Sequence, residues 1–314
     1  MSPYKILKKI IKFFTPYLLL RLYWQFSYLI DDIFFKIRSF EKTNNFGVDL
    51  KNNSQECVVL LNGPSLNKII KKKDYDFFKN KIKICVNRMC LSEYFFEIKP
   101  EFLCFMDPAY WKKNPSITIK QRNDKTFECL KKISWKITIV MSNEAKNHNF
   151  ITDLPLVNKN VDIKYINTSI SNYNENKFNK KFNKLKFIEY KFNKASPVKF
   201  NVSLIAIYLS INIGFSKVYL FGLDHSWHKK ISVNNDNIIF VEYDNFYKKK
   251  PELIPYYKDH THTSTFRFSE LFKMFSNIHY IHEELNEYAK FMNVEIYNCT
   301  GSESNVDAYK RFTF

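Results

Sequence analysis

The sequence predicts an α/β fold with a doubly wound, mostly parallel, Rossmann-like sheet, and two observations indicate it. Short apolar runs of strand length alternate with segments of helical spacing from residue 57 almost to the C-terminal end. Such alternation is typical of a parallel sheet whose crossover connections are helices. Polar residues also stand directly after most of these apolar runs. That edge of a doubly wound sheet is where ligands bind.

Length and composition agree with a large folded domain. The chain has 314 residues, of which 45% are hydrophobic and 18% aromatic, so it can bury a sizeable core. Because this length exceeds the usual single-domain size, we expect one large α/β domain, or one domain with an appendage.

The expected elements follow from the apolar pattern. Predicted strands are residues 57–61, 82–86, 102–106, 137–141, 163–165, 218–221 and 294–297. Helical spacing is present at 66–73, 203–213 and 267–291. Segments 168–194 and 232–262 have no clear period. We therefore expect irregular insertions there, and a lid-like insertion around 232–262 that folds over a ligand.

The first forty residues differ from the rest of the chain. Lysines alternate with aliphatic residues and are followed by a stretch rich in Trp, Tyr, Phe and Leu. Charges cut this stretch into pieces far short of the ~20 apolar residues that span a bilayer. The pattern favours amphipathic helices at a membrane interface for residues 1–40, although helices that pack on the core or on a partner fit it too. No signal-peptide cleavage site is evident. Residues 41–55 are a polar linker, and 56–314 form the Rossmann-like domain.

The net charge limits the kind of partner, and the cysteines indicate the redox compartment. A formal net charge of +18 implies an anionic partner such as a membrane surface or a phosphorylated ligand. The chain has no zinc-finger spacing, RNP-like strand or basic-zipper heptad, so nucleic acid is not expected. Six scattered cysteines without a CxxC pair indicate buried free thiols in a reducing compartment.

One turn has the geometry of an anion site. Asn62, Gly63, Pro64 and Ser65 stand between an apolar strand and the helical spacing that begins at Leu66. A strand, a tight turn and a helix start expose backbone N–H groups to an anion. An ordinary βα turn is the alternative for this motif taken alone.

The ends of the other predicted strands are also polar. Because the carboxyl ends of parallel strands meet at one edge of the sheet, we expect these side chains to surround a ligand, with the amides binding a base or a sugar. The expected ligand-binding residues at strand ends are Asn62, Gly63, Pro64, Ser65, Asn87, Asp107, Ser142, Asn143, Gly222 and Asp224.

Four of these motifs carry a resemblance to a known family. They are Asn-Gly-Pro-Ser-Leu at 62–66, Cys-Val-Asn at 85–87, Ile-Val-Met-Ser-Asn at 139–143 and Gly-Phe-Ser-Lys-Val-Tyr-Leu-Phe-Gly-Leu-Asp at 214–224. In this order they resemble the bacterial sialyltransferases of glycosyltransferase family 42, from about residue 57 to residue 304. The first motif is also similar to the proteins that include 6-hydroxymethylpterin pyrophosphokinases.

The resemblance implies a GT-A-like single domain with a lid that binds a CMP-linked sugar without an obligatory metal or other cofactor. It implies that Asn62, Gly63 and Ser65 hold the phosphate and ribose, that Asn87 contacts the nucleotide, and that Ser142 and Asn143 lie beside the cytidine. Asp107, and His225 to Trp227, depart from the family pattern and leave the donor sugar open.

The same resemblance implies a catalytic base. The family has a histidine just before the helix that follows the lid, which here corresponds to His262, with His260 as its neighbour. A neutral imidazole can take the proton of an attacking hydroxyl. Arg267, Tyr243 or Tyr247 could stabilise the departing phosphate. Thr300 and Ser302, in the turn after the last predicted strand, are expected nucleotide or phosphate contacts from their position in the resemblance, and a simple terminal strand and turn is the alternative.

A metal cluster is the alternative interpretation of the histidines. Asp224, His225 and His228, completed by His260 and His262, offer ligand types that suit Zn or Mn, but the spacing matches no short metal motif, and we expect no metal. His279 and His282 fall in a helical pattern and are expected to be surface or packing residues.

Together these features predict a bacterial glycosyltransferase of surface-glycan synthesis, either lipooligosaccharide or capsule. It would be cytoplasmic and peripheral on the inner face of the cell membrane, and would transfer sialic acid or a similar acidic sugar from a CMP-linked donor to a glycan or glycolipid. One rival is a pterin-type pyrophosphokinase with ATP and Mg²⁺ on Asp107 and Asp224. A second rival is a non-catalytic glycan- or nucleotide-binding partner of an assembly. The sequence leaves homo-oligomerisation open.

Overall fold

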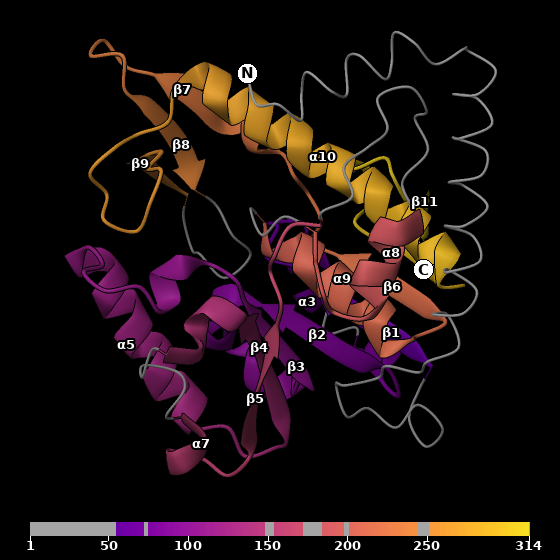
Figure 1. Ribbon diagram of the computed structural model, residues 1–314. Coiled ribbons are helices and arrows are strands. Elements are labelled where there is room, and N and C mark those ends of the chain that lie inside the picture. Colours follow the sequence, from indigo (N-terminus) through magenta and orange to yellow (C-terminus); the bar gives the residue numbers. More distant parts are fainter. Residues whose placement is uncertain are drawn as a thin grey trace, which may run out of the picture.

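The computed structural model describes residues 55–71, 75–147, 154–171, 184–197, 201–243 and 251–313 (Figure 1). The helices and strands labelled in Figure 1 all belong to these ranges. The helices expected at 1–40 lie outside the described residues, as does nearly all of the linker expected at 41–55.

The fold is built on a parallel sheet, as predicted. Its eight described strands are ordered β11-β10-β6-β1-β2-β3-β4-β5, and all neighbouring pairs run parallel. The strands are β1 (Glu56–Leu60), β2 (Ile82–Val86), β3 (Phe102–Phe105), β4 (Ile137–Ser142), β5 (Val161–Ile166), β6 (Lys217–Phe221), β10 (Glu295–Asn298) and β11 (Lys310–Arg311). The sheet confirms the α/β, Rossmann-like fold class.

Helices cover both faces of the sheet (Figure 1). One face carries α8 (Lys184–Lys191), α9 (Val202–Ile213) and α10 (Phe268–Phe291), and the other carries α3 (Leu66–Ile70), α4 (Tyr94–Ile98), α5 (Ile117–Lys131) and α7 (Leu154–Val157). Short 3-10 turns join these elements: η1 (Asp76–Phe78), η2 (Asn87–Leu91), η3 (Pro108–Tyr110), η4 (Asn143–Asn147), η5 (Trp227–Lys230) and η6 (Gly301–Glu303). No helix within the described ranges is long and apolar enough to cross a membrane.

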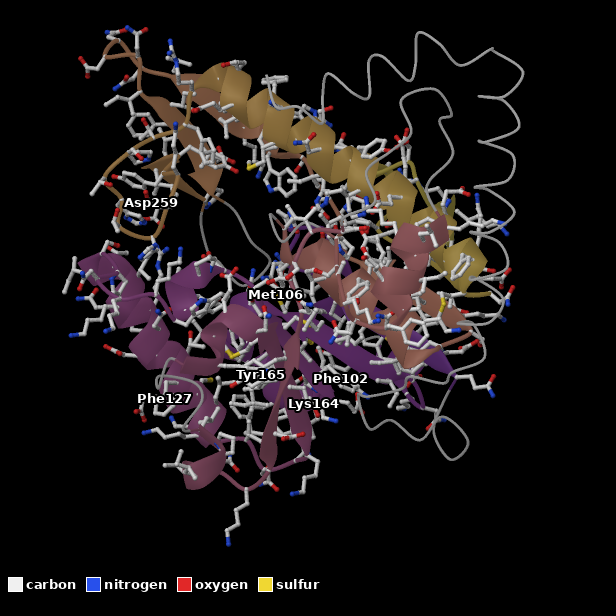
Figure 2. All side chains as sticks on the ribbon, in the orientation of Figure 1. Phe102, Met106, Phe127, Lys164, Tyr165 and Asp259 are labelled. Atoms are coloured by element: carbon white, nitrogen blue, oxygen red, sulfur yellow. The ribbon has the colours of Figure 1, made fainter. Side chains whose placement is uncertain are left out.

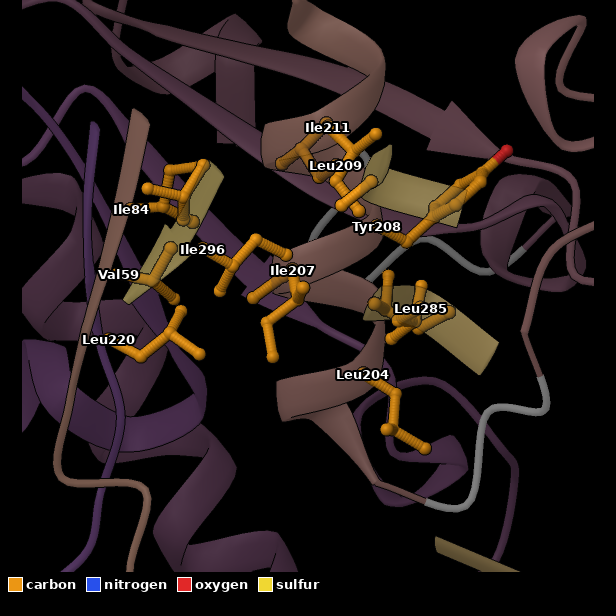
Figure 3. Close-up of a cluster of buried hydrophobic side chains, with 14 of the residues drawn as sticks. Val59, Ile84, Leu204, Ile207, Tyr208, Leu209, Ile211, Leu220, Leu285 and Ile296 are labelled. Carbon is orange, nitrogen blue, oxygen red and sulfur yellow. The ribbon is translucent and has the colours of Figure 1, made fainter. Parts of the chain in front are cut away.

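The helix α9 is the centre of the core. Every residue from Ser203 to Ile213 is buried, as expected of a helix that is apolar on all sides. Figure 3 shows Ile207 of α9 among side chains from β1, β2, β6 and β10, with Leu285 of α10 on its other side. The Asn201 side chain caps the start of α9 by accepting a hydrogen bond from the Ser203 N–H. Gly214, at φ 95°, ends it.

The strand order reverses between β1 and β6. From β1 the chain builds the sheet outward through β2, β3 and β4 to β5, and β6 then returns to the other side of β1. In open α/β sheets this switch point opens a crevice at the carboxyl ends of the strands, where ligands bind. The turns after β1 and β6 therefore define where a site is to be sought.

The structure corrects the expectation for segment 232–262. It holds a three-stranded antiparallel sheet made of β7 (Ile231–Val233), β8 (Ile239–Tyr243) and β9 (Glu252–Pro255). The Asn234 side chain orders the β7–β8 turn by accepting hydrogen bonds from the N–H groups of Asp236 and Ile238, at 3.0 and 2.8 Å. These strands are short and partly exposed, so their apolar pattern is too brief to show a period.

Four of the described helices, α4, α5, α7 and α8, are missing from the sequence prediction. The helices α4 and α7 are single turns of five and four residues, too short to show a period. Segment 168–194, for which the pattern predicts an irregular insertion, contains α8, which buries Phe187, Ile188 and Tyr190. The helix α5 buries the two polar residues Asn123 and Thr126 among its core positions. A polar residue in the buried stripe hides the helical period from a hydrophobicity pattern. All six cysteines are free, five of them buried and Cys129 partly buried, as predicted.

Candidate active site

A cavity of about 620 Å³ lies at the carboxyl ends of β1, β2, β3 and β6. Its opposite wall comes from β8, β9 and the segment before α10, which includes Asp259 (labelled in Figure 2). The polar and aromatic residues that line the cavity are Asn62, Asn87, Arg88, Asp107, Lys112, Arg122, Asn201, Ser203, Asp224, His225, Ser226, Trp227, Lys230, Glu242, Tyr256, Tyr257, Lys258, Asp259, His260 and His262. The cavity therefore stands at the switch point of the sheet, where the fold itself predicts a ligand.

The turn after β1 is packed directly against the turn after β6. The Gly63 N–H donates to the Gly222 carbonyl at 3.0 Å. A Cβ on Gly63 would collide with the Asp224 carboxylate and with the Gly222 carbonyl oxygen, and a Cβ on Gly222 would collide with the Leu61 carbonyl oxygen. Two glycines are needed here because two backbones cross with no room for a side chain.

The donors at the start of α3 are already used within the fold. The Ser65 amide donates to Asp224 Oδ2 at 3.0 Å, and the Ser65 hydroxyl donates to Asp224 Oδ1. The next amide, of Leu66, bonds to the Gly63 carbonyl at 3.1 Å. The expectation that Ser65 holds a phosphate is therefore not met in this structure, because the Asp224 carboxylate takes the anion's place. Burial raises the pKa of Asp224, while the Ser65 hydrogen bonds lower it.

Two asparagines of the predicted set do line the cavity. Asn62 donates from Nδ2 to the Val86 carbonyl at 3.3 Å, which links the ends of β1 and β2. Asn87 has a left-handed backbone (φ 50°). Its Oδ1 is buried without a hydrogen-bond partner in the described part of the chain, so this oxygen remains able to accept a hydrogen bond from a ligand. Asp107 also lines the cavity, but its Oδ1 already accepts from the Ala109 N–H at 2.8 Å and caps η3.

Arginines bring positive charge to one side of the cavity. The Arg88 guanidinium lies 5.0 Å from the centre of the Tyr110 ring and contacts the Asn123 side chain at 3.4 Å. Arg122 of α5 lies 3.7 Å from Glu252 of β9. These contacts place both cations at the cavity wall, where guanidinium groups suit phosphate or carboxylate oxygens.

Both histidines of the predicted base lie in the cavity wall. His262, with a left-handed backbone (φ 61°), stacks on Tyr257 with ring centres 4.1 Å apart and an angle of 4° between the planes. Burial, with Arg122 as the next cause, lowers the pKa of His262 below its ordinary value, so its imidazole is neutral at pH 7. His260 Nε2 lies 3.1 Å from the Lys113 carbonyl, and the Ser116 amide donates to the His260 carbonyl at 3.0 Å. His260 therefore ties this wall to the start of α5.

A third histidine, His225, lies at the end of β6. Its ring stacks on Trp227 at 4.2 Å, and its Nε2 lies 2.8 Å from Nε2 of His282. His282 is fully buried in α10, which agrees with the prediction of a packing residue and corrects the alternative of a surface residue. The metal interpretation finds no support, since no group of three or more His, Cys, Asp or Glu in the described ranges is placed to hold an ion.

Several predicted residues lie away from the cavity. Ser142 Oγ and Thr168 Oγ1 are 2.7 Å apart, and Thr168 also contacts the Asn143 side chain at 3.3 Å, so this pair lies at the outer strands β4 and β5. The Thr300 hydroxyl accepts from the Leu223 amide at 2.9 Å and supports the β6 turn from behind. The exposed residues Ser302 and Arg267 are not in the wall, and Arg267 caps α10. Tyr243 ends β8, but its side chain is not described, and Tyr247 lies outside the described residues.

Sequence reasoning missed part of the wall. The residues it did not single out include Asn201, Lys112, Arg122, Tyr256 and Lys258. Asn201 had a recognisable signal, because it is a helix-cap residue just before an apolar helix. The others come from the approach to α5, from α5 itself and from the strand β9 and its following loop, and only the folding of these elements over the sheet brings them to the cavity.

Comparison with known proteins adds little to this geometry. No known family model and no curated protein matches the chain. Among solved structures, the MAf glycosyltransferase from Magnetospirillum magneticum AMB-1 matches at 11% sequence identity and a TM-score of 0.41. The match covers 83% of this chain and 34% of that one, so this chain spans about a third of the neighbour's length. A likeness of this degree decides nothing about activity, and the resemblance to family 42 stays a prediction.

Proposed function

We propose that this protein is a glycosyltransferase that moves a sugar from a nucleotide-linked donor to a hydroxyl of a glycan acceptor. The observation that carries the proposal is the cavity at the β1/β6 switch point, where amides, arginines and a neutral histidine line one space. Amides recognise a base or a sugar, arginines recognise a phosphate, and a neutral imidazole accepts a proton. Sialic acid, or a similar acidic sugar linked to CMP, is the proposed donor.

The donor would lie against the ends of β1 and β2. The Asn87 Oδ1, buried and without a partner in the described structure, can accept a hydrogen bond from an amino or hydroxyl group of the nucleoside. Arg88 and Arg122 flank the same wall and would face the anionic part of the donor. Their positive charge stabilises the negative charge that builds up on the leaving phosphate.

The acceptor would approach the wall that holds His262. The neutral imidazole takes the proton of the acceptor hydroxyl as its oxygen forms a bond to the anomeric carbon. The bond between that carbon and the phosphate oxygen breaks, and the nucleotide departs with the electron pair. The Tyr257 ring, stacked on His262, holds the imidazole in one orientation, which a general base needs.

The sequence alone supports the proposed location. Residues 1–40 combine lysines with aromatic and aliphatic residues, so we propose that they hold the catalytic domain at the inner face of the cell membrane. Each lysine near an anionic surface adds about 1 kcal/mol. Replacing Lys5, Lys8, Lys9 and Lys12 by Gln should shift the full-length protein from the membrane fraction to the soluble fraction. Undiminished sedimentation with anionic vesicles would contradict the proposal.

Ligand stabilisation tests the proposed donor. Thermal shift with CMP, UDP, GDP and ATP, each with and without Mg²⁺, should show stabilisation by CMP that does not need the metal. Stabilisation by ATP that requires Mg²⁺ would favour a pyrophosphokinase. The absence of any nucleotide effect would favour a non-catalytic binding partner.

A variant pair tests the base. The His262→Ala variant should transfer sugar at least 100-fold more slowly than the wild type, since general bases contribute roughly 10²- to 10⁴-fold. The exposed His228 in η5 gives the matched control, His228→Ala, with unchanged transfer. Equal rates for the two variants would exclude His262 as the base.

A further inference from the structure

A chain of hydrogen bonds runs from the interior of the protein to His225 in the cavity wall. The Tyr309 hydroxyl lies 2.9 Å from His282 Nδ1, and His282 Nε2 lies 2.8 Å from His225 Nε2. All three side chains are buried, with exposed fractions of 4%, 0% and 7%. Ser203 Oγ stands 3.5 Å from the same His225 nitrogen.

The direction of these hydrogen bonds follows from Tyr309. Burial raises the pKa of Tyr309 well above its ordinary value, so the phenol keeps its proton. Within the described structure His282 Nδ1 is the only hydrogen-bond partner of this hydroxyl. A buried O–H has to be donated, so Tyr309 donates to His282 Nδ1. His282 then carries its own proton on Nε2 and donates it to His225 Nε2. His225 is left with its proton on Nδ1.

Neither imidazole takes a second proton near neutral pH. Burial lowers the pKa of His282 to about 3, and burial, His282 and His279 together lower the pKa of His225 well below its ordinary value. None of the hydrogen bonds found for His225 or His282 goes to a carboxylate. Asp307 and Glu283 act on the neighbouring His279 instead. Trp227 covers one face of the His225 ring.

The remaining nitrogen of His225 is open to the cavity. His225 Nδ1 has no hydrogen-bond partner among the described residues. This nitrogen atom is also not fully buried, in contrast to the Asn87 Oδ1. Nδ1 therefore keeps some exposed surface, and His225 is one of the residues that line the cavity. We propose that His225 is a fixed, neutral Nδ1–H donor that binds an anionic oxygen of the ligand, and that Tyr309 and His282 set the position of its proton.

The chemical class of the ligand group follows from this arrangement. An Nδ1–H group donates and cannot accept, so His225 is not a second base beside His262. To give its proton away, His225 would have to draw protons from His282 and finally from Tyr309, which would leave a buried phenolate. Donation without proton transfer suits a phosphate or a carboxylate oxygen. The restriction of the ligand group to a phosphate or a carboxylate rests on the proposed function, because a CMP-linked acidic sugar carries both. The role of His225 as a donor to an anionic oxygen does not rest on it.

Nuclear magnetic resonance reads the tautomers directly. The full-length protein, labelled with ¹⁵N-histidine, contains seven histidines. Long-range ¹H–¹⁵N correlation spectra at pH 7.5 should show His225 protonated on Nδ1 alone and His282 on Nε2 alone. The variants His225→Asn and His282→Gln identify the signals. A His225 signal with the proton on Nε2 would overturn the inference, and so would a doubly protonated ring.

Two variants separate positioning from folding. Tyr309→Phe removes only the hydroxyl, so the folded protein should show His225 as a mixture of both tautomers. The half-buried Tyr297 of β10, whose hydroxyl contacts the Glu295 side chain at 3.0 Å, provides the control Tyr297→Phe, which should leave the His225 signal unchanged. An unchanged His225 tautomer in folded Tyr309→Phe would show that Tyr309 does not set the proton.

The ligand arms use inorganic phosphate, CMP, cytidine and free N-acetylneuraminate at matched ionic strength. A shift of the His225 Nδ1–H signal with phosphate and CMP, but not with cytidine, identifies a phosphate partner, and a shift with N-acetylneuraminate identifies a carboxylate partner. His225→Ala should weaken binding of the active probe about 10-fold or more, the usual effect of a hydrogen bond to a charged group. His225→Asn, which keeps an N–H donor, should bind within about 3-fold of the wild type.

The outcomes keep this inference apart from the proposed function. If CMP stabilises the protein and sugar transfer occurs while no probe moves the His225 signal, the function stands and the donor role fails. If phosphate or N-acetylneuraminate moves the signal while no nucleotide-linked sugar is used, the donor role stands and the function fails.

Discussion

The carboxylate of Asp224 accepts hydrogen bonds from both the amide and the hydroxyl of Ser65. Asp224 follows β6 and Ser65 precedes α3, so this contact joins the two elements that meet at the switch point of the sheet. A negative charge at a helix N-terminus is favourable. The chain therefore supplies its own anion at a position where the sequence predicted one from a ligand.

Removing this carboxylate should destabilise the fold. Asp224→Ala leaves the buried amide and hydroxyl of Ser65 without a partner and should lower the free energy of unfolding by about 1–3 kcal/mol. Asp224→Asn keeps one acceptor and removes a buried charge, so it should cost less. Urea unfolding measures both. The exposed Asp124 of α5 supplies the control Asp124→Asn, and an Asp224→Ala variant as stable as this control would contradict the account.

The two crossing glycines should tolerate no side chain. Gly63→Ala and Gly222→Ala each drive a Cβ into backbone or carboxylate oxygen, and each should destabilise the protein by roughly 2–3 kcal/mol or more. Gly301 has a positive φ of 77°, but a Cβ there would meet no atom closer than 3.5 Å, so Gly301→Ala should cost only about 1 kcal/mol. Equal thermal midpoints for the three variants would show that close approach is not the cause.

The stability of the fold should depend on the ion pair between the buried carboxylate of Glu284 and Lys186. Glu284 receives a hydrogen bond from Tyr190 at 2.5 Å and lies 2.5 Å from the Lys186 ammonium, and its side chain is 2% exposed. Lys186→Met leaves this charge buried without its cation and should cost about 3 kcal/mol. The exposed pair of Lys290 and Glu287 offers the comparison, since Lys290→Met should change stability by no more than about 0.5 kcal/mol. Similar losses of unfolding free energy for Lys186→Met and Lys290→Met, measured by denaturant unfolding, would contradict this account.

Acid should destabilise the protein through His282. Burial lowers the pKa of folded His282 to about 3 from the ordinary value of 6.5. Between these values the unfolded chain binds the proton and the folded chain does not, so stability is full above pH 6.5 and falls as the pH drops toward 3. The loss from pH 7.5 to 5.5 should be about 1–1.5 kcal/mol for this histidine alone.

The variant His282→Gln should remove that part of the pH dependence, although the variant itself is less stable. His228→Gln, at the exposed position in η5, should keep the wild-type slope of unfolding free energy against pH. Identical slopes for wild type and His282→Gln would show that His282 titrates normally in the fold.

The sheet could be predicted from sequence because its central strands are largely buried on both faces. The run from Ile82 to Val86 was predicted with the observed ends, and the other six predicted strands differ from the structure by one or two residues at an end. Each is an apolar run bounded by polar residues. Such a pattern shows that a strand is present but fixes its first and last residues less well. The edge strand β11, of two exposed residues, has no such signal and was missed.

The site could be predicted only where it depends on strand order. Asn62 and Asn87 follow neighbouring parallel strands, and strand adjacency is enough to bring them together. Ser142 is the last residue of β4, which lies three strands from β1, and the sequence did not show how far the cavity extends along the sheet edge. The contact between His225 and His282, 57 positions apart, depends on how α10 packs over the end of β6.

Tyr309 immediately precedes β11, whose one partner strand among the described residues is β10, at the edge of the sheet. Edge segments open at a free energy well below that of global unfolding. Transient detachment of this C-terminal edge would withdraw the phenol from His282, while the central strands stay folded. The two imidazoles could then adopt either tautomer. Hydrogen exchange of the backbone amides of β11 would then report the fraction of molecules in which the proton of His225 is held on Nδ1. Thermal unfolding does not measure this fraction.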